Sequence, residues 1–255
     1  MGIMEGKKGL IIGVANERSI AWGIAQALAK QGAQIGFTYA LDQLEKRVRP
    51  LAESVGSTFV HKLDVTNDAQ LDEVFGLAKE RFQTLDFVLH AVAFSDKNEL
   101  KGPYYNTTRA NFLNTMDISV YSFTAMARKA VELMPNGGAL LTLTFYGARK
   151  VITNYNVMGV AKAALEASVQ YLAVDMGPKN IRVNAISAGP IKTLASAGIS
   201  DFKEMLNMGQ SRAPLGRNVS LEEIGDAGLF LLSDMSTAIT GEVLFVDCGY
   251  QATGV

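Results

Sequence analysis

The stretch LIIGVANERSI, residues 10–20, decides the fold. A short apolar run rich in isoleucine reaches Gly13, and Ser19 stands directly before an amphipathic segment that begins at Ile20. This order predicts a strand, a tight turn and a helix, the unit with which an open parallel α/β sheet begins. The G-x-G-x-x-G spacing of many phosphate-binding turns is absent, so the turn alone fits a phosphate site and an ordinary helix start equally well.

The same alternation of short apolar runs and longer amphipathic segments continues along the chain. The predicted strands are Leu10–Val14, Gln34–Tyr39, Thr58–Lys62, Phe87–Ala93, Ala139–Phe145, Arg182–Ile186 and Glu242–Val246. The predicted helices are Ile20–Gln31, Leu41–Val55, Ala69–Phe82, Arg109–Met134, Tyr155–Met176 and Leu221–Ser233, with Asn67 and Ser220 as N-caps. Strands joined by helices require crossover connections. We therefore predict one Rossmann-type, doubly wound parallel sheet of about seven strands, with helices on both faces.

Residues 1–255 are interpreted as a single domain, because no linker, repeat or change of composition interrupts the pattern. The segment at about 191–217 does not fit the alternation. Between Gly198 and Gly209 it holds four apolar residues at helical spacing, which are Ile199, Phe202, Met205 and Leu206. We expect a small lid over a site here, with a short helix packed on the surface as the alternative.

The composition excludes several classes of protein. Of 255 residues, 48% are hydrophobic and 19% charged, which is typical of a chain with a large core and no long disordered segment. The formal net charge of −1 provides no general attraction for nucleic acid. One cysteine, Cys248, and two separated histidines, His61 and His90, form no disulfide and no metal-ligand pattern. With no leader and no uninterrupted membrane-spanning apolar run, we expect a cytoplasmic protein.

The ends of the predicted strands indicate a dinucleotide site. The second strand is followed by Ala40, with no Arg or Lys beside it to pair with a 2′-phosphate, and this favours NAD over NADP. Asp64 and Val65 follow the third strand, where they would suit an adenine, although an Asp in that place is more often a helix cap. Small residues around Val92 follow the fourth strand and would let a flat ring approach the backbone.

The segment YNVMGVAK, residues 155–162, carries the candidate chemistry. Tyr155 and Lys162 are almost two helical turns apart, so both side chains lie on one face, about 10 Å apart along the axis. A phenol is protonated at neutral pH and can donate a hydrogen bond to a developing enolate oxygen, while an ammonium can hold a ribose hydroxyl. The alternative for the pair alone is a partly buried tyrosine with a solvated lysine.

Four motifs together resemble one family. They are Gly13-x5-Ser19-Ile20, the Tyr155–Lys162 segment, RVNAISAGPI at residues 182–191 and VDCG at residues 246–249. The combination is similar to the NADH-dependent enoyl-acyl-carrier-protein reductases of bacterial fatty-acid synthesis, a divergent branch of the short-chain dehydrogenase/reductases. Six residues separate the tyrosine and lysine in this branch, against three in ordinary members of the superfamily. The resemblance covers nearly the whole chain.

The resemblance implies a role for each matching residue. Tyr155 would hydrogen-bond the thioester carbonyl while NADH delivers hydride to the β-carbon of the enoyl chain, and Lys162 would hold the nicotinamide ribose. The implied cofactor-binding residues are Gly13, Ala15, Ser19, Ile20, Asp64, Val65, Val92, Lys162, Ile191, Thr193, Leu194 and Ala195. The implied substrate-binding residues are Ser95, Phe145, Tyr155, Met158, Ile199 and Phe202. It also implies a homotetramer that acts on acyl carrier protein, with no metal, nucleic acid or membrane partner.

Two positions depart from the family pattern. Phe145 stands where many relatives have a second tyrosine, so we expect an apolar wall there, and the neighbouring Tyr146 should face the other way. Ala40 stands where NADH-using relatives often have glutamine. A carbonyl reductase of the same superfamily and a dinucleotide-sensing module without catalysis remain as alternatives. If an acidic carrier protein is the partner, a local basic patch of Lys192, Lys203 and Arg212 would attract it.

Overall fold

The computed structural model describes residues 2–193 and 202–253 and contains one parallel sheet. Its strand order is β3-β2-β1-β4-β5-β6-β7. The strands are β1 Lys8–Ile12, β2 Gln34–Tyr39, β3 Val60–Lys62, β4 Phe87–His90, β5 Gly138–Thr144, β6 Ile181–Ala188 and β7 Val243–Val246. The chain runs outward from β1 to β3, then returns to add β4 on the other side of β1. The prediction of a doubly wound, seven-stranded parallel sheet is confirmed.

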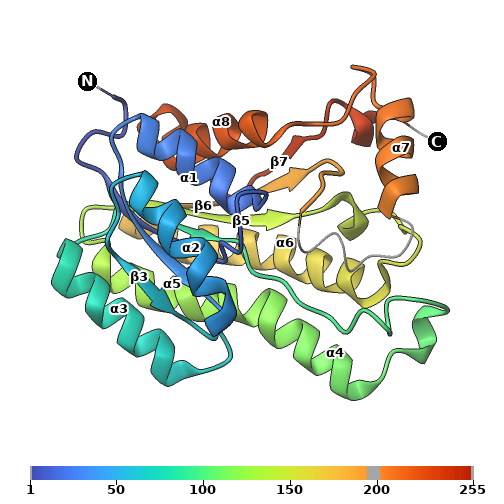
Figure 1. Cartoon of the computed structure of the whole chain (residues 1–255), viewed down its shortest axis with the longest axis horizontal. Coiled ribbons are helices and arrows are strands. Elements are labelled where there is room, and N and C mark those ends of the chain that lie inside the picture. Colours follow the sequence, from blue (N-terminus) through green and yellow to red (C-terminus); the bar gives the residue numbers. More distant parts are fainter. Residues whose placement is uncertain (1, 194–201, 254–255) are drawn as a thin grey trace.

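Helices cover both faces of the sheet, with α1 and α8 on one side and α3, α5 and α6 on the other (Figure 1). The helices are α1 Ile20–Lys30, α2 Asp42–Ser54, α3 Asp68–Phe82, α4 Arg109–Met116, α5 Ser122–Leu133, α6 Asn156–Met176, α7 Phe202–Arg212 and α8 Leu221–Leu232. Alternate residues of β1 enter opposite layers, since Leu10 and Ile12 join one core cluster and Ile11 the other. Both faces of the sheet are therefore buried.

The predicted N-caps at Asn67 and Ser220 are confirmed. The side chain of Asn67 accepts from the backbone N–H groups of Ala69 and Gln70. Ser220 forms a complete capping box with Glu223, in which each side chain accepts from the other residue's backbone N–H. These caps fix where α3 and α8 begin.

The helix predicted over Arg109–Met134 is wrong in one respect, because a π-helical turn over Asp117–Tyr121 separates α4 from α5. Ser119 lies in this turn, is buried, and bonds both the N–H and the carbonyl of Phe94 in the loop after β4. Ser122 directly follows the turn and contacts His90. The π turn thus directs Ser119 and Ser122 toward the end of β4 and the loop that follows it. Such turns are common near functional sites.

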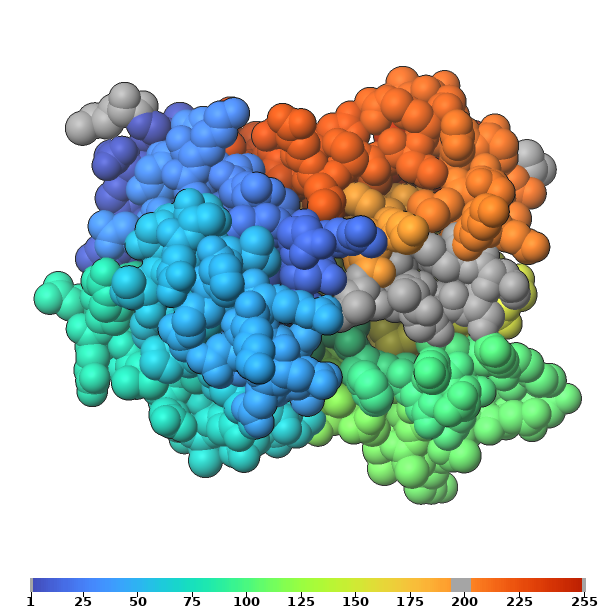
Figure 2. All heavy atoms as spheres, in the orientation of Figure 1, coloured from blue at the N-terminus to red at the C-terminus, as the bar shows by residue number. Residues whose placement is uncertain are grey.

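Two strands end earlier than their apolar runs predict. β1 stops at Ile12 rather than Val14, and β4 stops at His90 rather than Ala93. The N–H of Ala91 still donates to the carbonyl of Ile12, and from there residues 13–15 and 91–93 line a cleft. In Figure 2 the green segment near residue 100 lies at the lower right and the orange segment of α7 at the upper right.

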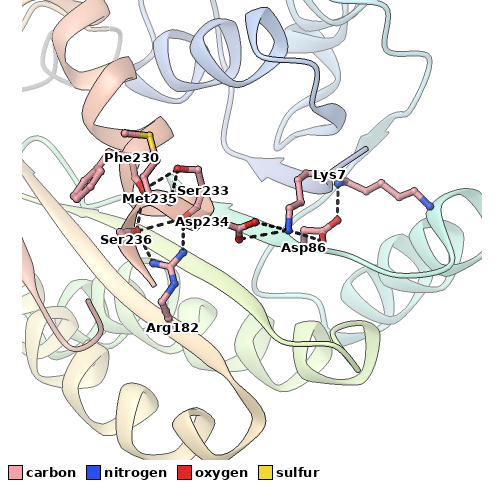
Figure 3. A network of polar contacts seen from close by, with 9 residues as sticks. Lys7, Asp86, Arg182, Phe230, Ser233, Asp234, Met235 and Ser236 are labelled. Carbon is pink, nitrogen blue, oxygen red and sulfur yellow. Dashed lines mark hydrogen bonds and ion pairs between the residues drawn. The ribbon is translucent and has the colours of Figure 1, made fainter. Parts of the chain in front are cut away.

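A polar network lies at the amino-terminal end of β6, away from the cleft (Figure 3). Arg182, the second residue of β6, donates to the carbonyls of Leu231 and Ser233 and to the hydroxyl of Ser236. Burial lowers the pKa of this guanidinium, the nearby carboxylate of Asp234 opposing the effect. The Arg182 contacts join the start of β6 to the end of α8.

Among the described residues, one helical segment, Asn156–Lys179, is long and apolar enough by length and composition alone to cross a membrane. It contains α6 and the short 3₁₀ turn that follows. Its Ala161, Leu165 and Val169 side chains are fully buried in the core cluster under the sheet. That placement is typical of the central helix of a layered α/β fold.

Candidate active site

A cleft of about 1150 Å³ opens at the carboxyl ends of the central strands. The turn after β1, the segments after β4 and β5, the start of α6 and the segment after β6 all contribute to its walls. This is the place where open α/β sheets bind their ligands. The cleft brings together twelve of the residues singled out from the sequence, which are Gly13, Ala15, Ser19, Ile20, Val92, Ser95, Phe145, Tyr155, Met158, Lys162, Ile191 and Thr193.

Gly13 forms the floor of the cofactor end because no other residue fits there. Its φ angle is +103°, and a Cβ atom would lie 2.2 Å from the carbonyl oxygen of Ala91. The turn after β1 therefore packs directly on the segment after β4. A ligand in the cleft can approach this backbone without meeting a side chain.

Ser19 directly precedes α1, but its side chain shapes the same turn instead of capping the helix. Its hydroxyl oxygen accepts from the backbone N–H groups of Ala15 and Asn16, 3.0 and 3.1 Å away, and makes no hydrogen bond to α1. The turn folds back far enough to present its own N–H groups to the serine. The pattern of a serine before a helix could not distinguish these two uses.

Tyr155 stands immediately before α6 and is almost completely buried. Its ring packs on Gly147, where a Cβ atom would come within 2.5 Å of Tyr155 Cδ1, and on the edge of Phe145. Burial raises the pKa of the phenol above its usual value of 10.0. The hydroxyl is therefore a proton-bearing hydrogen-bond donor at neutral pH.

Lys162 lies two turns further along α6, and its exposed fraction is 6%. Its Nζ donates to the carbonyl oxygen of Leu143 near the end of β5, at 2.8 Å. Burial lowers its pKa from 10.5 to about 8, against the opposing effect of the Glu166 carboxylate. The ammonium is thus held in a fixed place at the cleft and remains mostly charged at pH 7.

His90 ends β4 near this pair and is held on both sides of its ring. Its two ring nitrogens are each 2.8 Å from a hydroxyl, one of Thr142 and one of Ser122. Burial and the charge of Lys162 lower its pKa to about 3, so the ring is neutral. Both nitrogens are occupied, which leaves the ring no free position for general base catalysis.

Sequence reasoning missed Asn111, a buried residue of α4 that lines the cleft. Its side-chain oxygen accepts from the backbone N–H of Asp96 at 3.0 Å, and its amide lies 3.2 Å from the hydroxyl of Ser95. The amide thereby fixes the segment after β4 above the cleft. In the sequence Asn111 stands out only because it follows the helix cap Thr108 by three residues. That position does not predict a contact with Ser95 and Asp96, which lie about fifteen residues earlier.

Six of the predicted site residues are not among the described residues that line the cleft. Val65 belongs to the core cluster, and Asp64 turns its carboxylate onto the backbone N–H and hydroxyl of Thr66. Leu194, Ala195 and Ile199 lie outside the described residues, as does the side chain of Phe202, the residue with which α7 begins. Met205 of α7 does reach the cleft.

The cleft suits a dinucleotide. Gly13 provides the close backbone approach, and the long cleft continues from Ala40 and Leu44 at one end to Tyr155 and Met158 at the other. Lys62, on the neighbouring strand end, is paired with Asp42 at 2.9 Å. The end of β2 therefore presents no unpaired cation next to Ala40, in agreement with the sequence argument for NAD.

Comparison with known proteins identifies the family of the chain. The family model for enoyl-(acyl carrier protein) reductase matches residues 13–251. The chain belongs to the enoyl-acyl-carrier-protein reductase family. The resemblance stated from the sequence is thereby confirmed.

Individual members of the family are similar over their full length. The chain is 59% identical to the NADH-dependent enoyl-acyl-carrier-protein reductase 1 of Rhizobium meliloti, covering 100% of this chain and 93% of that one. It is 56% identical to the corresponding NADH-dependent reductase of Rickettsia prowazekii, covering 99% and 97%. The crystal structure of the Anaplasma phagocytophilum reductase in complex with NAD has a TM-score of 0.96 at 57% identity, covering 100% and 97%. That of the Bacillus cereus enzyme with NADP+ and indole naphthyridinone has a TM-score of 0.98 at 48% identity, covering the whole of both chains.

Proposed function

We propose that this chain reduces the trans-2 double bond of enoyl thioesters carried by acyl carrier protein, using NADH. The observation that carries the proposal is the burial of Tyr155 and Lys162 together in one long cleft at the carboxyl edge of the sheet. The oxidoreductase family to which the chain belongs supports it. Bound NADH would supply a hydride to the β-carbon of the substrate, and the resulting enolate would then take a proton at the α-carbon.

Tyr155 acts on the thioester carbonyl. Its hydroxyl donates a hydrogen bond to the carbonyl oxygen, which becomes an enolate oxygen as the β-carbon is reduced. Because burial raises its pKa, the phenol keeps its proton and acts as a donor instead of adding a second negative charge. The ring stays in place because Gly147 and Phe145 pack on two of its sides.

Lys162 binds the ribose next to the nicotinamide and stabilises negative charge at this end of the cleft. Its own hydrogen bond to Leu143 leaves two further N–H donors on the ammonium. Gly13, Ala15, Ser19 and Ile20 hold the pyrophosphate side. The roles of Asp64 and Val65 toward the adenine, of Ile191 to Ala195 over the cofactor, and of Ile199 and Phe202 beside the acyl chain are parts of the same proposal.

The test is NADH consumption with a crotonyl thioester. The wild type should oxidise NADH only when the enoyl thioester is present. Tyr155→Phe should lower kcat by about 10²- to 10³-fold with an unchanged NADH dissociation constant. Lys162→Ala should instead raise that dissociation constant about 10-fold or more. Tight NADH binding without turnover on any enoyl thioester would refute the reductase and favour a dinucleotide-sensing module.

The assembly is proposed to be a homotetramer of single-domain subunits, with a lid at about 191–217. Apolar side chains stand exposed on the outer side of the helical layer, with Tyr171 77% and Val174 75% exposed on α6 and Tyr121 50% exposed before α5. Such a patch favours burial against a second copy. Light scattering should give four times the 27.4 kDa chain mass, and Tyr171→Glu with Val174→Glu should yield smaller species.

The carrier protein is proposed to dock beside the lid in the cytoplasm. Lys192, Lys203 and Arg212 are all exposed around the segment after β6 and α7, and their charges would attract an acidic carrier. Reversing these charges should raise KM for the carrier-bound substrate and leave KM for a crotonyl thioester of a small thiol unchanged. Equal effects on both substrates would contradict this docking site.

A further inference from the structure

Glu166 joins the elements that deliver the two reactive side chains, although no motif drew attention to it. It lies on α6, one helical turn after Lys162, and only 13% of its side chain is exposed. Its Oε1 accepts from the hydroxyl of Thr144, the last residue of β5, at 2.9 Å. Its Oε2 accepts from Nε of Arg149 at 3.1 Å.

Arg149 extends this connection to the far edge of the sheet. It lies in the loop between β5 and α6, the loop that ends at Tyr155, and its guanidinium stacks over the ring of Phe245 on β7, 4.8 Å from the ring centroid. The loop is therefore attached at Arg149 both to α6, through Glu166, and to β7. These contacts add to the packing of Tyr146 on Phe245 and of Tyr155 on Phe145, which hold the same loop.

Two side chains of α6, one helical turn apart, each make a hydrogen bond to the end of β5. Lys162 donates to the carbonyl of Leu143, and Glu166 accepts from the side chain of the next residue, Thr144. Lys162 and Glu166 are four residues apart, about 6 Å along the helix axis, and the Glu166 carboxylate raises the pKa of Lys162. His90 on β4, which is neutral, and Tyr155, which is protonated, also lie near Lys162, and the Arg149 cation pairs with Glu166. Glu166 thus supplies the negative charge that opposes the cost of burying the Lys162 ammonium.

We propose that Glu166 is a positioning residue for the Tyr155–Lys162 pair, anchoring the loop that delivers Tyr155 and facing Lys162 as its counter-charge. The inference rests on the proposed function, in which Lys162 binds the cofactor ribose as an ammonium. It assigns two separable effects to one carboxylate: a mechanical effect through Arg149 and Thr144, and an electrostatic effect on Lys162.

The experiment separates the two effects by following the NADH dissociation constant against pH for the whole protein. Burial sets the pKa of Lys162 at about 8, so binding should weaken as the pH rises through that value. We call the pH at which this weakening is half complete the midpoint. Glu166→Gln retains an acceptor for Thr144 and removes the charge, so the midpoint should fall by about 1 pH unit. Arg149→Gln breaks the tether but keeps the carboxylate, so the midpoint should not fall while kcat decreases several-fold.

Asp175→Asn is the matched control, because it removes an exposed carboxylate from the same helix, three turns beyond Lys162. It should leave both the midpoint and kcat unchanged, and Glu166→Asp, which keeps the charge, should restore the wild-type midpoint. An unchanged midpoint in Glu166→Gln, or an equal fall in Arg149→Gln, would overturn the counter-charge. Absence of turnover by the wild type would refute the reductase instead, because the binding midpoints are measured without any enoyl substrate.

Discussion

The ring of Phe145 meets the ring of Tyr155 edge to face, with centroids 5.2 Å apart and planes inclined at 73°. Phe145 directly follows β5, and Tyr155 directly precedes α6, so this contact closes the loop between them. The ring of Tyr146 points elsewhere, packing on Phe245 and Tyr250. An apolar side chain, rather than a second phenol, therefore packs against the ring of Tyr155 in this chain.

Replacing Phe145 with alanine should slow the reaction without affecting cofactor binding. The aromatic pair contributes about 0.5–1.5 kcal/mol beyond simple burial, and its loss leaves the Tyr155 ring free to tilt. We expect kcat with a crotonyl thioester to fall about 3- to 10-fold at an unchanged NADH dissociation constant. Tyr146→Phe is the control and should retain full kcat. A large loss of kcat in that control would mean that Tyr146 takes part in the reaction.

Replacing Lys162 with methionine should make the ligand-free protein more stable while weakening NADH binding. The fall of the Lys162 pKa from 10.5 to about 8 corresponds to on the order of 3 kcal/mol of destabilisation below pH 8. The hydrogen bond to Leu143 offsets about 1 kcal/mol of this. We expect the free energy of urea unfolding at pH 7 to rise by about 1–2 kcal/mol.

The pH dependence gives this prediction its sign. Between pH 8 and 10.5 the unfolded chain holds the Lys162 proton more often than the folded chain does, so the wild type gains stability from this group as the pH rises. The advantage of Lys162→Met should therefore shrink between pH 7 and pH 9.5. Lys179→Met, at an exposed position, should show no such dependence. An advantage that does not change with pH would contradict a buried ammonium at position 162.

Replacing Arg182 with methionine should lower stability but leave the active site intact. The guanidinium donates to the carbonyls of Leu231 and Ser233 and to Ser236 at the edge of the sheet opposite the cleft (Figure 3). Its loss leaves these partly buried acceptors without their donor, at a cost of about 3 kcal/mol in urea unfolding. The NADH dissociation constant should stay at the wild-type value.

Lys7→Met tests the same network at its exposed side. Lys7 pairs with Asp234 at 3.2 Å and Asp86 at 3.6 Å, where all three side chains remain open to solvent. Exposed pairs of this kind contribute less than about 1 kcal/mol. A loss as large as that of Arg182→Met would show that the exposed pairs carry the stability of this edge.

Features that depend on local spacing could be predicted from the sequence. The alternation of strands and helices, the Gly13 turn and the shared face of Tyr155 and Lys162 each follow from the identity of residues within a few positions of one another. The spacing of Tyr155 and Lys162 was enough to predict their shared face, because α6 is a regular helix over this stretch.

Features that depend on contacts between distant segments could not be predicted. Asn111 reaches Asp96 across a loop, and Glu166 reaches Arg149 across another, at separations that no periodicity encodes. The π turn at Asp117–Tyr121 exists because Ser119 finds the backbone of Phe94, a tertiary contact that overrides the helical pattern. The position of Ser19 fits hydrogen bonds either to the first N–H groups of α1 or to those of the preceding turn. The fold of the turn places the N–H groups of Ala15 and Asn16 against its hydroxyl.

Replacing Asp42 with asparagine should weaken the preference for NADH. Asp42 pairs with Lys62, which lies beside Tyr39 in the register of β2 and β3, close to the end of the cleft marked by Ala40. Removing the carboxylate leaves the Lys62 ammonium available for a 2′-phosphate. Because this cation is partly exposed and screened, we expect only a 3- to 10-fold gain in NADPH affinity, about 1 kcal/mol, with NADH affinity unchanged. Asp42→Asn combined with Lys62→Met should remove the gain, whereas persistence of the gain in the double variant would show that another cation reads the phosphate.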